Sequence, residues 1–181
     1  MKKEWSLQGP RLVEIKIYPD SRGFFTERFN ESRFKEQGLP SKFVQDNHSR
    51  SRPGVIRGLH YQHSPGQGKL VGVIRGRIWD VIVDLRKGSS TFGKWESVEL
   101  SDENGLLLWV PEGFAHGFCV LGEEDADVIY KVDSPYSPKT EGGIRYDDPE
   151  LNIEWPVQNP IVSDKDRVLP GFSDYSKSTV F

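Results

Sequence analysis

Three histidines in this sequence could hold a metal ion or act as bases. His60 and His63 lie in "RGLHYQHSPGQGKLVGVIRG" (57–76), and His116 lies in "PEGFAHG". The second stretch has the P-x-G-x-x-H spacing that is found in metal-binding β-barrels. On a strand, residues three apart point to opposite faces, so only one histidine of the first pair can join His116 inside a barrel.

The residue types near these histidines do not favour a metal. The position at which a carboxylate ligand would follow the first histidine is close to Lys69. An ammonium group cannot bind a cation, and divalent metals need three or four N, O or S ligands. We therefore predict no metal site.

A metal-free site with these groups could move protons. A neutral imidazole is a good general base near neutral pH, and a lysine could hold an oxyanion. Together, His60 and Lys69 suit the removal of a proton next to a carbonyl group. The alternative is that His60 is an ordinary hydrogen-bonded strand residue, and the spacing alone does not decide between the two.

Other polar residues stand in apolar surroundings. Arg22, Glu27 and Arg28 lie among the phenylalanines of "RGFFTERF", and Tyr130 lies inside "DVIYKV". Each alone could be a surface residue, but together they indicate a polar cavity. Arg22 and Arg57 could bind phosphate groups through two hydrogen bonds each.

Most of the elements that must position these residues are predicted to be strands. Val, Ile and aromatic residues dominate short stretches that are separated by turn-forming residues, which is typical of a β-sandwich or barrel. One short helix is expected, with Asn30 as its N-cap and Gly38 as its stop. The expected strands cover 11–17, 55–61, 69–76, 77–85, 95–100, 105–110 and 125–132, and the helix covers 31–37.

Length and composition limit the class of protein. A chain of 181 residues fits one domain, 1–181, whose residues from 134 onward are expected to wrap the barrel and to carry short helices. Charged residues make up 28% and the net charge is -3, which favours a globular protein without a nucleic-acid partner. No apolar run is long enough to span a membrane, and "MKKEWSLQGP" does not resemble a signal peptide. We expect a cytoplasmic protein whose single Cys119 is buried.

Long stretches of the sequence resemble one enzyme family. "FVQDNHS", "RGLHYQ", "VDLRKGSSTFGKW", "WVPEGFAHGF" and "YSPKTEGGI" resemble, in order, those of the dTDP-4-keto-6-deoxyglucose 3,5-epimerases. The resemblance covers nearly the whole chain, from "DSRGFFTE" to "SDKD". It implies an all-β, cupin-type jelly roll without a metal or another cofactor, and a homodimer that exchanges N-terminal strands.

The resemblance also implies roles for four catalytic residues. The family's base corresponds to His60, its partner carboxylate to Asp166 and its proton donor to Tyr130. Lys69 corresponds to the lysine beside the C4 oxygen, although loop lengths vary before it. The implied reaction inverts C3 and C5 of the dTDP-linked 4-keto sugar by proton transfer alone, as a step toward dTDP-L-rhamnose. No redox cofactor is needed, and the chain has no G-x-G-x-x-G loop.

The family's substrate contacts correspond to residues spread along the chain. By this resemblance the contacts are Arg22, Phe25, Glu27, Gln45, Asp46, Asn47, Arg57, His116, Tyr136, Glu141 and Lys165. Three alternatives stay open: an epimerase that inverts only C3 or only C5, a metal-dependent cupin oxygenase or isomerase, and a cupin that binds sugar nucleotides without catalysis.

Overall fold

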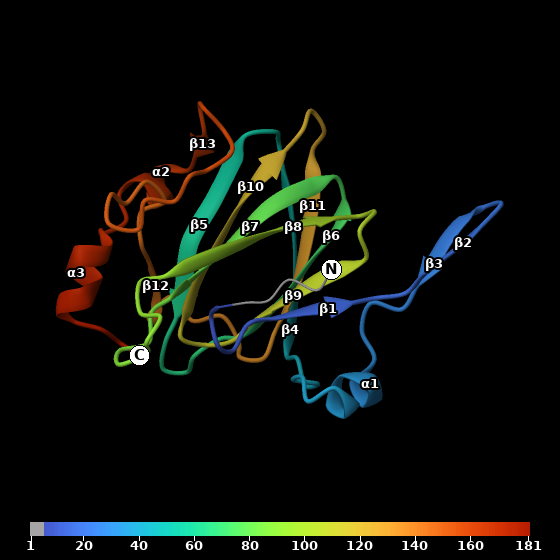
Figure 1. Cartoon of the computed structure of the whole chain (residues 1–181), viewed down its shortest axis with the longest axis horizontal. Coiled ribbons are helices and arrows are strands. Elements are labelled where there is room, and N and C mark those ends of the chain that lie inside the picture. The colour runs from blue at the N-terminus through green and yellow to red at the C-terminus, as the bar shows by residue number, and fades with distance from the viewer. Residues whose placement is uncertain (1–5) are drawn as a thin grey trace.

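The computed structural model describes residues 6–181, and its main body is a sandwich of two sheets whose strands are antiparallel except for the parallel pair of β13 (Ile161–Val162) and β5 (Val55–Gln62) (Figure 1). Residues 1–5, which belong to the stretch expected not to be a signal peptide, lie outside the described residues. The all-β prediction is confirmed, because the two sheets contain eleven of the thirteen strands found in residues 6–181. Within the described part of the chain, no helix is long and apolar enough to cross a membrane.

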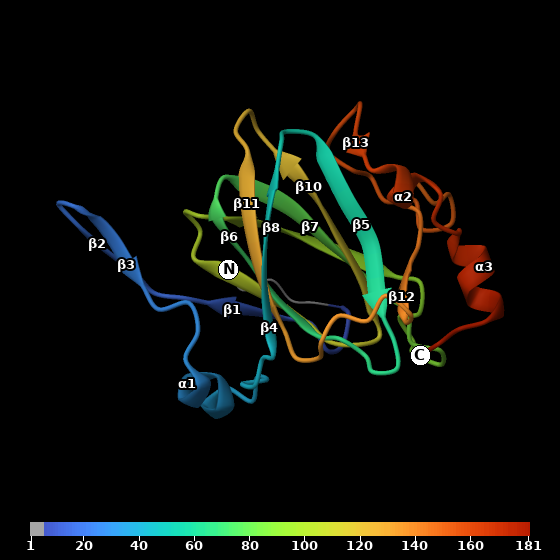
Figure 2. The ribbon, with the colours of Figure 1, turned by 180° about the vertical axis from the view of Figure 1, so that it is seen from behind.

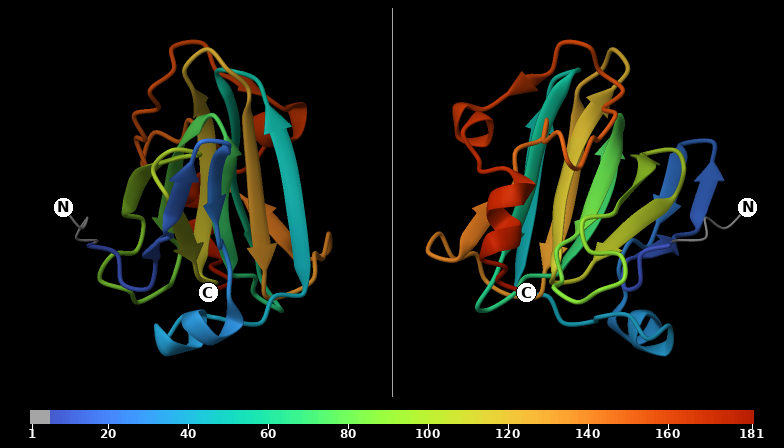
Figure 3. Two further views of the ribbon diagram at one scale, coloured as in Figure 1. Left: turned by 90° about the vertical axis from the view of Figure 1, so that its right-hand side faces the viewer. Right: turned by 60° about the vertical axis from the view of Figure 1, so that its left-hand side comes forward.

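The first sheet has five strands and the second has six. The first runs in the order β1 (Arg11–Glu14), β9 (Leu106–Val110), β6 (Lys69–Arg75), β11 (Ala126–Val132) and β4 (Gln45–Ser51). The second runs β12 (Glu141–Gly143), β5 (Val55–Gln62), β10 (Phe114–Leu121), β7 (Arg77–Asp84) and β8 (Trp95–Ser101), with β13 (Ile161–Val162) paired to β5. Figure 3 shows the two sheets facing each other.

The core between the sheets is made of branched aliphatic and aromatic side chains. Val71 and Leu108 of the first sheet pack with Ile82 and Phe118 of the second, and all four are buried. Cys119 is buried as predicted, and burial raises the pKa of its thiol to about 12. Burial of each such side chain contributes about 1.5–3 kcal/mol, so this core holds the two sheets together.

A separate hairpin projects from the body of the molecule. β2 (Ile17–Asp20) pairs with β3 (Gly23–Thr26) alone, and Figures 1 and 2 show it pointing away from the sandwich. The prediction of one strand over 11–17 was therefore wrong. β1 pairs with β9 only as far as Glu14, and the chain then leaves the sheet, so the alternating pattern is shared between two different sheets.

The helices are short and lie outside the sheets. α1 (Glu31–Glu36) begins after Asn30, whose side chain accepts the Arg33 N–H, and is followed by Gly38 with a positive φ, as predicted. α2 (Asp164–Arg167) begins after Ser163, whose hydroxyl accepts the Asp166 N–H. α3 (Phe172–Lys177) packs Phe172 and Tyr175 behind the second sheet. Residues 134–181 thus contribute two strands beside β5 and two helices, and α2 brings its side chains to the rim of the sandwich.

Candidate active site

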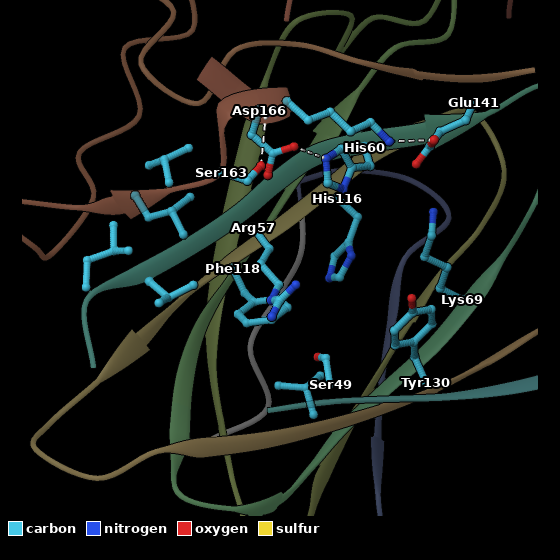
Figure 4. Close-up of a pocket in the computed structure, with 16 residues that line it drawn as sticks. Ser49, Arg57, His60, Lys69, His116, Phe118, Tyr130, Glu141, Ser163 and Asp166 are labelled. Atoms are coloured by element: carbon cyan, nitrogen blue, oxygen red, sulfur yellow. Dashed lines mark hydrogen bonds and ion pairs between the residues drawn. The ribbon is translucent and has the colours of Figure 1, made fainter. Parts of the chain in front are cut away.

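A cavity of about 570 Å³ opens between the two sheets, and most of its polar lining comes from predicted site residues. Figure 4 shows these side chains in the cavity. A second cavity, of about 310 Å³, adjoins it and shares His60, Lys69, Tyr130 and Glu141. The predicted residues that line the first cavity are Arg57, His60, Lys69, His116, Tyr130, Glu141, Lys165 and Asp166. Gln45, Asn47 and Tyr136 line the second.

His60 forms an imidazole–carboxylate pair with Asp166. The His60 Nε2 lies 2.7 Å from the Asp166 carboxylate, which also accepts the Gly58 N–H at 3.3 Å. Burial alone would raise the pKa of Asp166, but the hydrogen bonds from His60, from the Gly58 N–H and from Ser163 lower it, so the carboxylate stays ionised. A neutral His60 that donates Nε2–H to this carboxylate keeps a lone pair on Nδ1 for a proton.

Gly58 explains how Asp166 comes close to β5. Its φ is +132°, and a Cβ at this position would lie 2.5 Å from the Cα of Gly117 on β10. Only glycine fits both the conformation and the close approach of the two strands. The Gly58 N–H then donates to the carboxylate of Asp166 in α2, which holds that carboxylate beside β5, close to His60.

A second imidazole–carboxylate pair stands beside the first. His116 on β10 is the cross-strand neighbour of His60 on β5, and its Nε2 lies 2.9 Å from the carboxylate of Asp80 on β7. Asp80 is fully buried, and burial raises its pKa, while His116 and Lys69 partly offset this effect. With Nε2 bonded to Asp80, the Nδ1 atom of His116 is left for another partner.

Lys69 is a buried ammonium at the first position of β6. It is 9% exposed, and burial lowers its pKa to about 8, although the charges of Asp133, Glu141 and Asp80 act in the opposite direction. A cation in this position has lost most of its water, so its attraction for a negatively charged oxygen is stronger than at the surface. Figure 4 places Lys69 beside Tyr130 in the cavity.

Tyr130 lies on β11, in the sheet opposite to the one that carries His60. Burial raises the pKa of its phenol; the positive charge of Arg57 opposes this effect and Glu141 adds to it. Tyr130 therefore keeps its proton at neutral pH and can donate it. A flat group bound between the sheets would have the imidazole of His60 on one side and the phenol of Tyr130 on the other (Figure 4).

The rim of the second cavity carries a short ionic chain. The Tyr136 hydroxyl donates to Glu141 at 2.9 Å, and the Lys165 ammonium donates to the same carboxylate at 2.7 Å. Burial alone would raise the pKa of Glu141, but these two hydrogen bonds lower it. Tyr136 itself is exposed and offers its ring to solvent. An aromatic ring beside charged groups at a cavity rim can stack on a planar base.

Four of the predicted binding residues do not reach either cavity within this chain. Arg22 pairs with Asp20 on the projecting hairpin, and Phe25 is 69% exposed there. Glu27 pairs with Arg33, and Asp46 pairs with Lys131 at an exposed position. His63 also lies away from both cavities, at the turn after β5.

Sequence reasoning missed Asp80 and Gln62. Both are buried polar residues, and a signal for Asp80 was present, because it is an acid in the middle of the apolar run "RIWDVIVDL". A charge in a strand of that kind needs a buried partner, which here is His116. Gln62 shares the inward face of β5 with His60, two residues away, and this alternation was also readable.

Comparison with known proteins finds relatives in one enzyme family. The family model of dTDP-4-dehydrorhamnose 3,5-epimerase matches residues 4–174. The enzyme of that name from Shigella flexneri is 57% identical over 86% of each chain, and the one from Methanothermobacter thermautotrophicus is 53% identical over 90% of this chain and 89% of its own. The crystal structure of dTDP-6-deoxy-D-glucose-3,5-epimerase from Legionella pneumophila, in complex with dTDP-4-keto-L-rhamnose, superposes with a TM-score of 0.88 at 48% identity, covering 92% of this chain and 89% of that one.

Proposed function

The chain belongs to the dTDP-4-dehydrorhamnose 3,5-epimerase family, and we propose how its residues invert C3 and C5 of dTDP-4-keto-6-deoxy-D-glucose. The family's cupin-type jelly roll is the sandwich of two sheets described above. The reaction is an isomerisation that gives dTDP-4-keto-L-rhamnose, a step in the synthesis of dTDP-L-rhamnose. The assignment of residue roles rests on one observation: His60 and Tyr130 lie on opposite sheets and line the same cavity.

In the first step His60 removes a carbon-bound proton. The C4 keto group acidifies the protons at C3 and C5, because the resulting negative charge moves onto the keto oxygen. The Nδ1 lone pair of His60 takes the proton, and Asp166 holds the ring and stabilises the imidazolium that forms. No electron leaves the substrate, so no redox cofactor is required.

The enolate oxygen then needs positive charge close to it. Lys69 supplies an ammonium from β6, and His116 supplies an Nδ1–H from β10 when both ring nitrogens carry a proton. Asp80 fixes the orientation of His116 and balances its charge. Donors that are already in place when the charge forms are worth several kcal/mol of barrier lowering.

In the last step Tyr130 returns a proton to the opposite face of the same carbon, which inverts the centre. Its raised pKa keeps the proton available at neutral pH, and the basic enolate carbon accepts it. Once His60 has released its proton to solvent and the Tyr130 phenolate has taken one from solvent, the same pair acts on the second carbon after the sugar has shifted or changed its pucker. An enzyme of this family that lacked a donor on the opposite face would exchange protons without net inversion.

The base of the nucleotide is assigned to the second cavity and its rim, and the diphosphate to the first cavity. Gln45 and Asn47 of β4 lie beside Tyr136, whose ring can stack on thymine, while Arg57 and Lys165 can bind the diphosphate. This sugar nucleotide is the small-molecule partner that we assign to the chain. We assign the protein to the cytoplasm, where nucleotide sugars are made.

A second copy of the chain would complete the site. Arg22, Phe25 and Glu27 are predicted substrate contacts, yet the hairpin and the segment after it leave them away from the cavity of their own chain. We propose a homodimer in which each hairpin reaches the cavity of the other copy. Phe25→Ala should then weaken dTDP binding while each chain keeps its fold, as judged by circular dichroism, because the side chain is exposed within its own chain.

A coupled assay tests the proposed function. The chain is incubated with dTDP-4-keto-6-deoxyglucose, a dTDP-4-keto-L-rhamnose reductase and NADPH, and NADPH oxidation is followed. Wild type should support oxidation, whereas His60→Asn should not, because it lacks a base. Oxidation at the wild-type rate with His60→Asn would contradict the assignment of the base.

A further inference from the structure

Glutamine side chains hold the segment that carries Tyr136. This Tyr136 segment, residues 134–137, follows β11, and each of its four residues has a backbone hydrogen bond to a glutamine. Gln67 donates to the Ser134 carbonyl at 2.8 Å, and Gln62 donates to the Pro135 carbonyl at 3.1 Å. The N–H of Tyr136 donates to Gln45 at 3.1 Å, and the N–H of Ser137 donates to Gln62 at 2.8 Å.

Gln62 is the centre of this arrangement. It is 3% exposed, and its Nε2 also donates to the Pro65 carbonyl at 3.2 Å, in the loop that leads to Lys69. The side chain thus uses both N–H groups and its oxygen on backbone atoms of two loops. A primary amide offers two donors and an acceptor at one site, whereas a carboxylate of the same shape offers acceptors alone.

The two loops depend on Gln62 to different degrees. Lys69 is paired in the strand ladder with Val110 on one side and Val132 on the other, which fixes its position without Gln62. The Tyr136 segment belongs to neither β11 nor β12 and has the glutamine bonds instead. Loss of Gln62 should therefore move Tyr136 more than Lys69.

We propose that Gln62, assisted by Gln67, is a positioning residue that holds Tyr136 at the nucleotide end of the site. The proposal rests on the proposed function, in which Tyr136 stacks on the base. It assigns to Gln62 a part in substrate affinity and not in proton transfer. It also explains why a fully hydrogen-bonded, buried glutamine stands two residues from His60 on the same strand face.

The test compares Gln62→Glu with Gln158→Glu, which adds the same charge at an exposed glutamine. The Kd for dTDP is measured by calorimetry, and kcat and KM are measured in the coupled assay. We expect Gln62→Glu to raise both Kd and KM about tenfold, the order of the one buried hydrogen bond that the Tyr136 segment loses at the Pro135 carbonyl, while kcat stays within about threefold. Gln158→Glu should match wild type.

Two results would overturn the inference: unchanged dTDP affinity in the Gln62 variant, or a fall in kcat at unchanged Kd. If Gln62→Glu does not fold, as judged by circular dichroism, Gln62→Met replaces it, since it removes the two bonds to the Pro65 and Pro135 carbonyls, and the bond from the Ser137 N–H as well, without adding charge. If wild type binds dTDP but shows no activity, the proposed function is contradicted. The inference on Gln62 is then still tested by the Kd for dTDP alone.

A double-variant cycle separates positioning from a general structural role. If Gln62 acts through Tyr136, then adding Gln62→Met to Tyr136→Ala should weaken dTDP binding by less than about twofold beyond Tyr136→Ala alone. Fully additive losses in the double variant would show that Gln62 acts elsewhere and would overturn the proposal.

Discussion

Replacing Lys69 by methionine should make the protein more stable and less active. The buried ammonium has a pKa of about 8 instead of its ordinary 10.5, and this difference corresponds to about 3 kcal/mol of unfavourable free energy in the folded state. Methionine fills a similar volume without a charge to bury. This difference already includes the attraction between the ammonium and the carboxylates of Asp133, Glu141 and Asp80, and it is an upper bound for the gain in unfolding free energy because methionine does not repeat every contact of the lysine stem. We expect Lys69→Met to be about 1–3 kcal/mol more stable at pH 7.

The stability difference between Lys69→Met and wild type should depend on pH. Between pH 8 and 10.5 the unfolded chain binds a proton at Lys69 that the folded chain has lost, so this lysine makes wild type more stable as pH rises through that window. The advantage of Lys69→Met should therefore be full below pH 8 and disappear by about pH 10.5. Denaturant unfolding at pH 7, 9 and 10.5 measures it, with Lys94→Met at an exposed position as the control. A Lys69→Met protein that is less stable than wild type at pH 7 would refute the reasoning.

Other predictions concern the proton-transfer groups and one loop. Asp166→Asn should lower kcat by a factor of about 10²–10⁴, because the amide no longer stabilises the His60 imidazolium, and the coupled assay measures this loss. Tyr130→Phe should lose net inversion more than deuterium exchange; an equal loss of both, followed by NMR, would count against Tyr130 as the donor. Asp84 accepts hydrogen bonds from Arg86, Ser89 and Thr91, which overcome the effect of burial and lower its pKa to about 2. Its carboxylate should therefore add stability above about pH 4 that is lost as pH falls toward 2, and an acid titration of Asp84→Asn should lack this component.

The sequence predicted those strands that have a regular apolar pattern. The predicted strands over 55–61, 69–76 and 77–85 correspond to β5, β6 and β7 within one residue at each end. β10 was not predicted as a strand, because nearly all of its residues are buried and it lacks alternation. β4 was missed for the opposite reason: "QDNHSRS" is polar throughout and lies at the edge of its sheet.

It was harder to predict which residues of the site pair with one another than which residues belong to it. His60 and Asp166 are 106 positions apart, and their pairing was expected only from the family resemblance. Spacing within a strand shows which face a side chain occupies, but it does not show which strand lies opposite. The roles of the site residues and the assignment of all 181 residues to one domain stay predictions.

The most direct test of the central claim follows protons at carbon. The protein is incubated with dTDP-4-keto-6-deoxyglucose in deuterated water, and C3 and C5 are observed by NMR. The account predicts deuterium at both carbons with wild type and at neither with His60→Asn. Deuterium at one carbon alone would make the protein a single-centre epimerase, and none at either carbon, with dTDP still bound, would contradict the account.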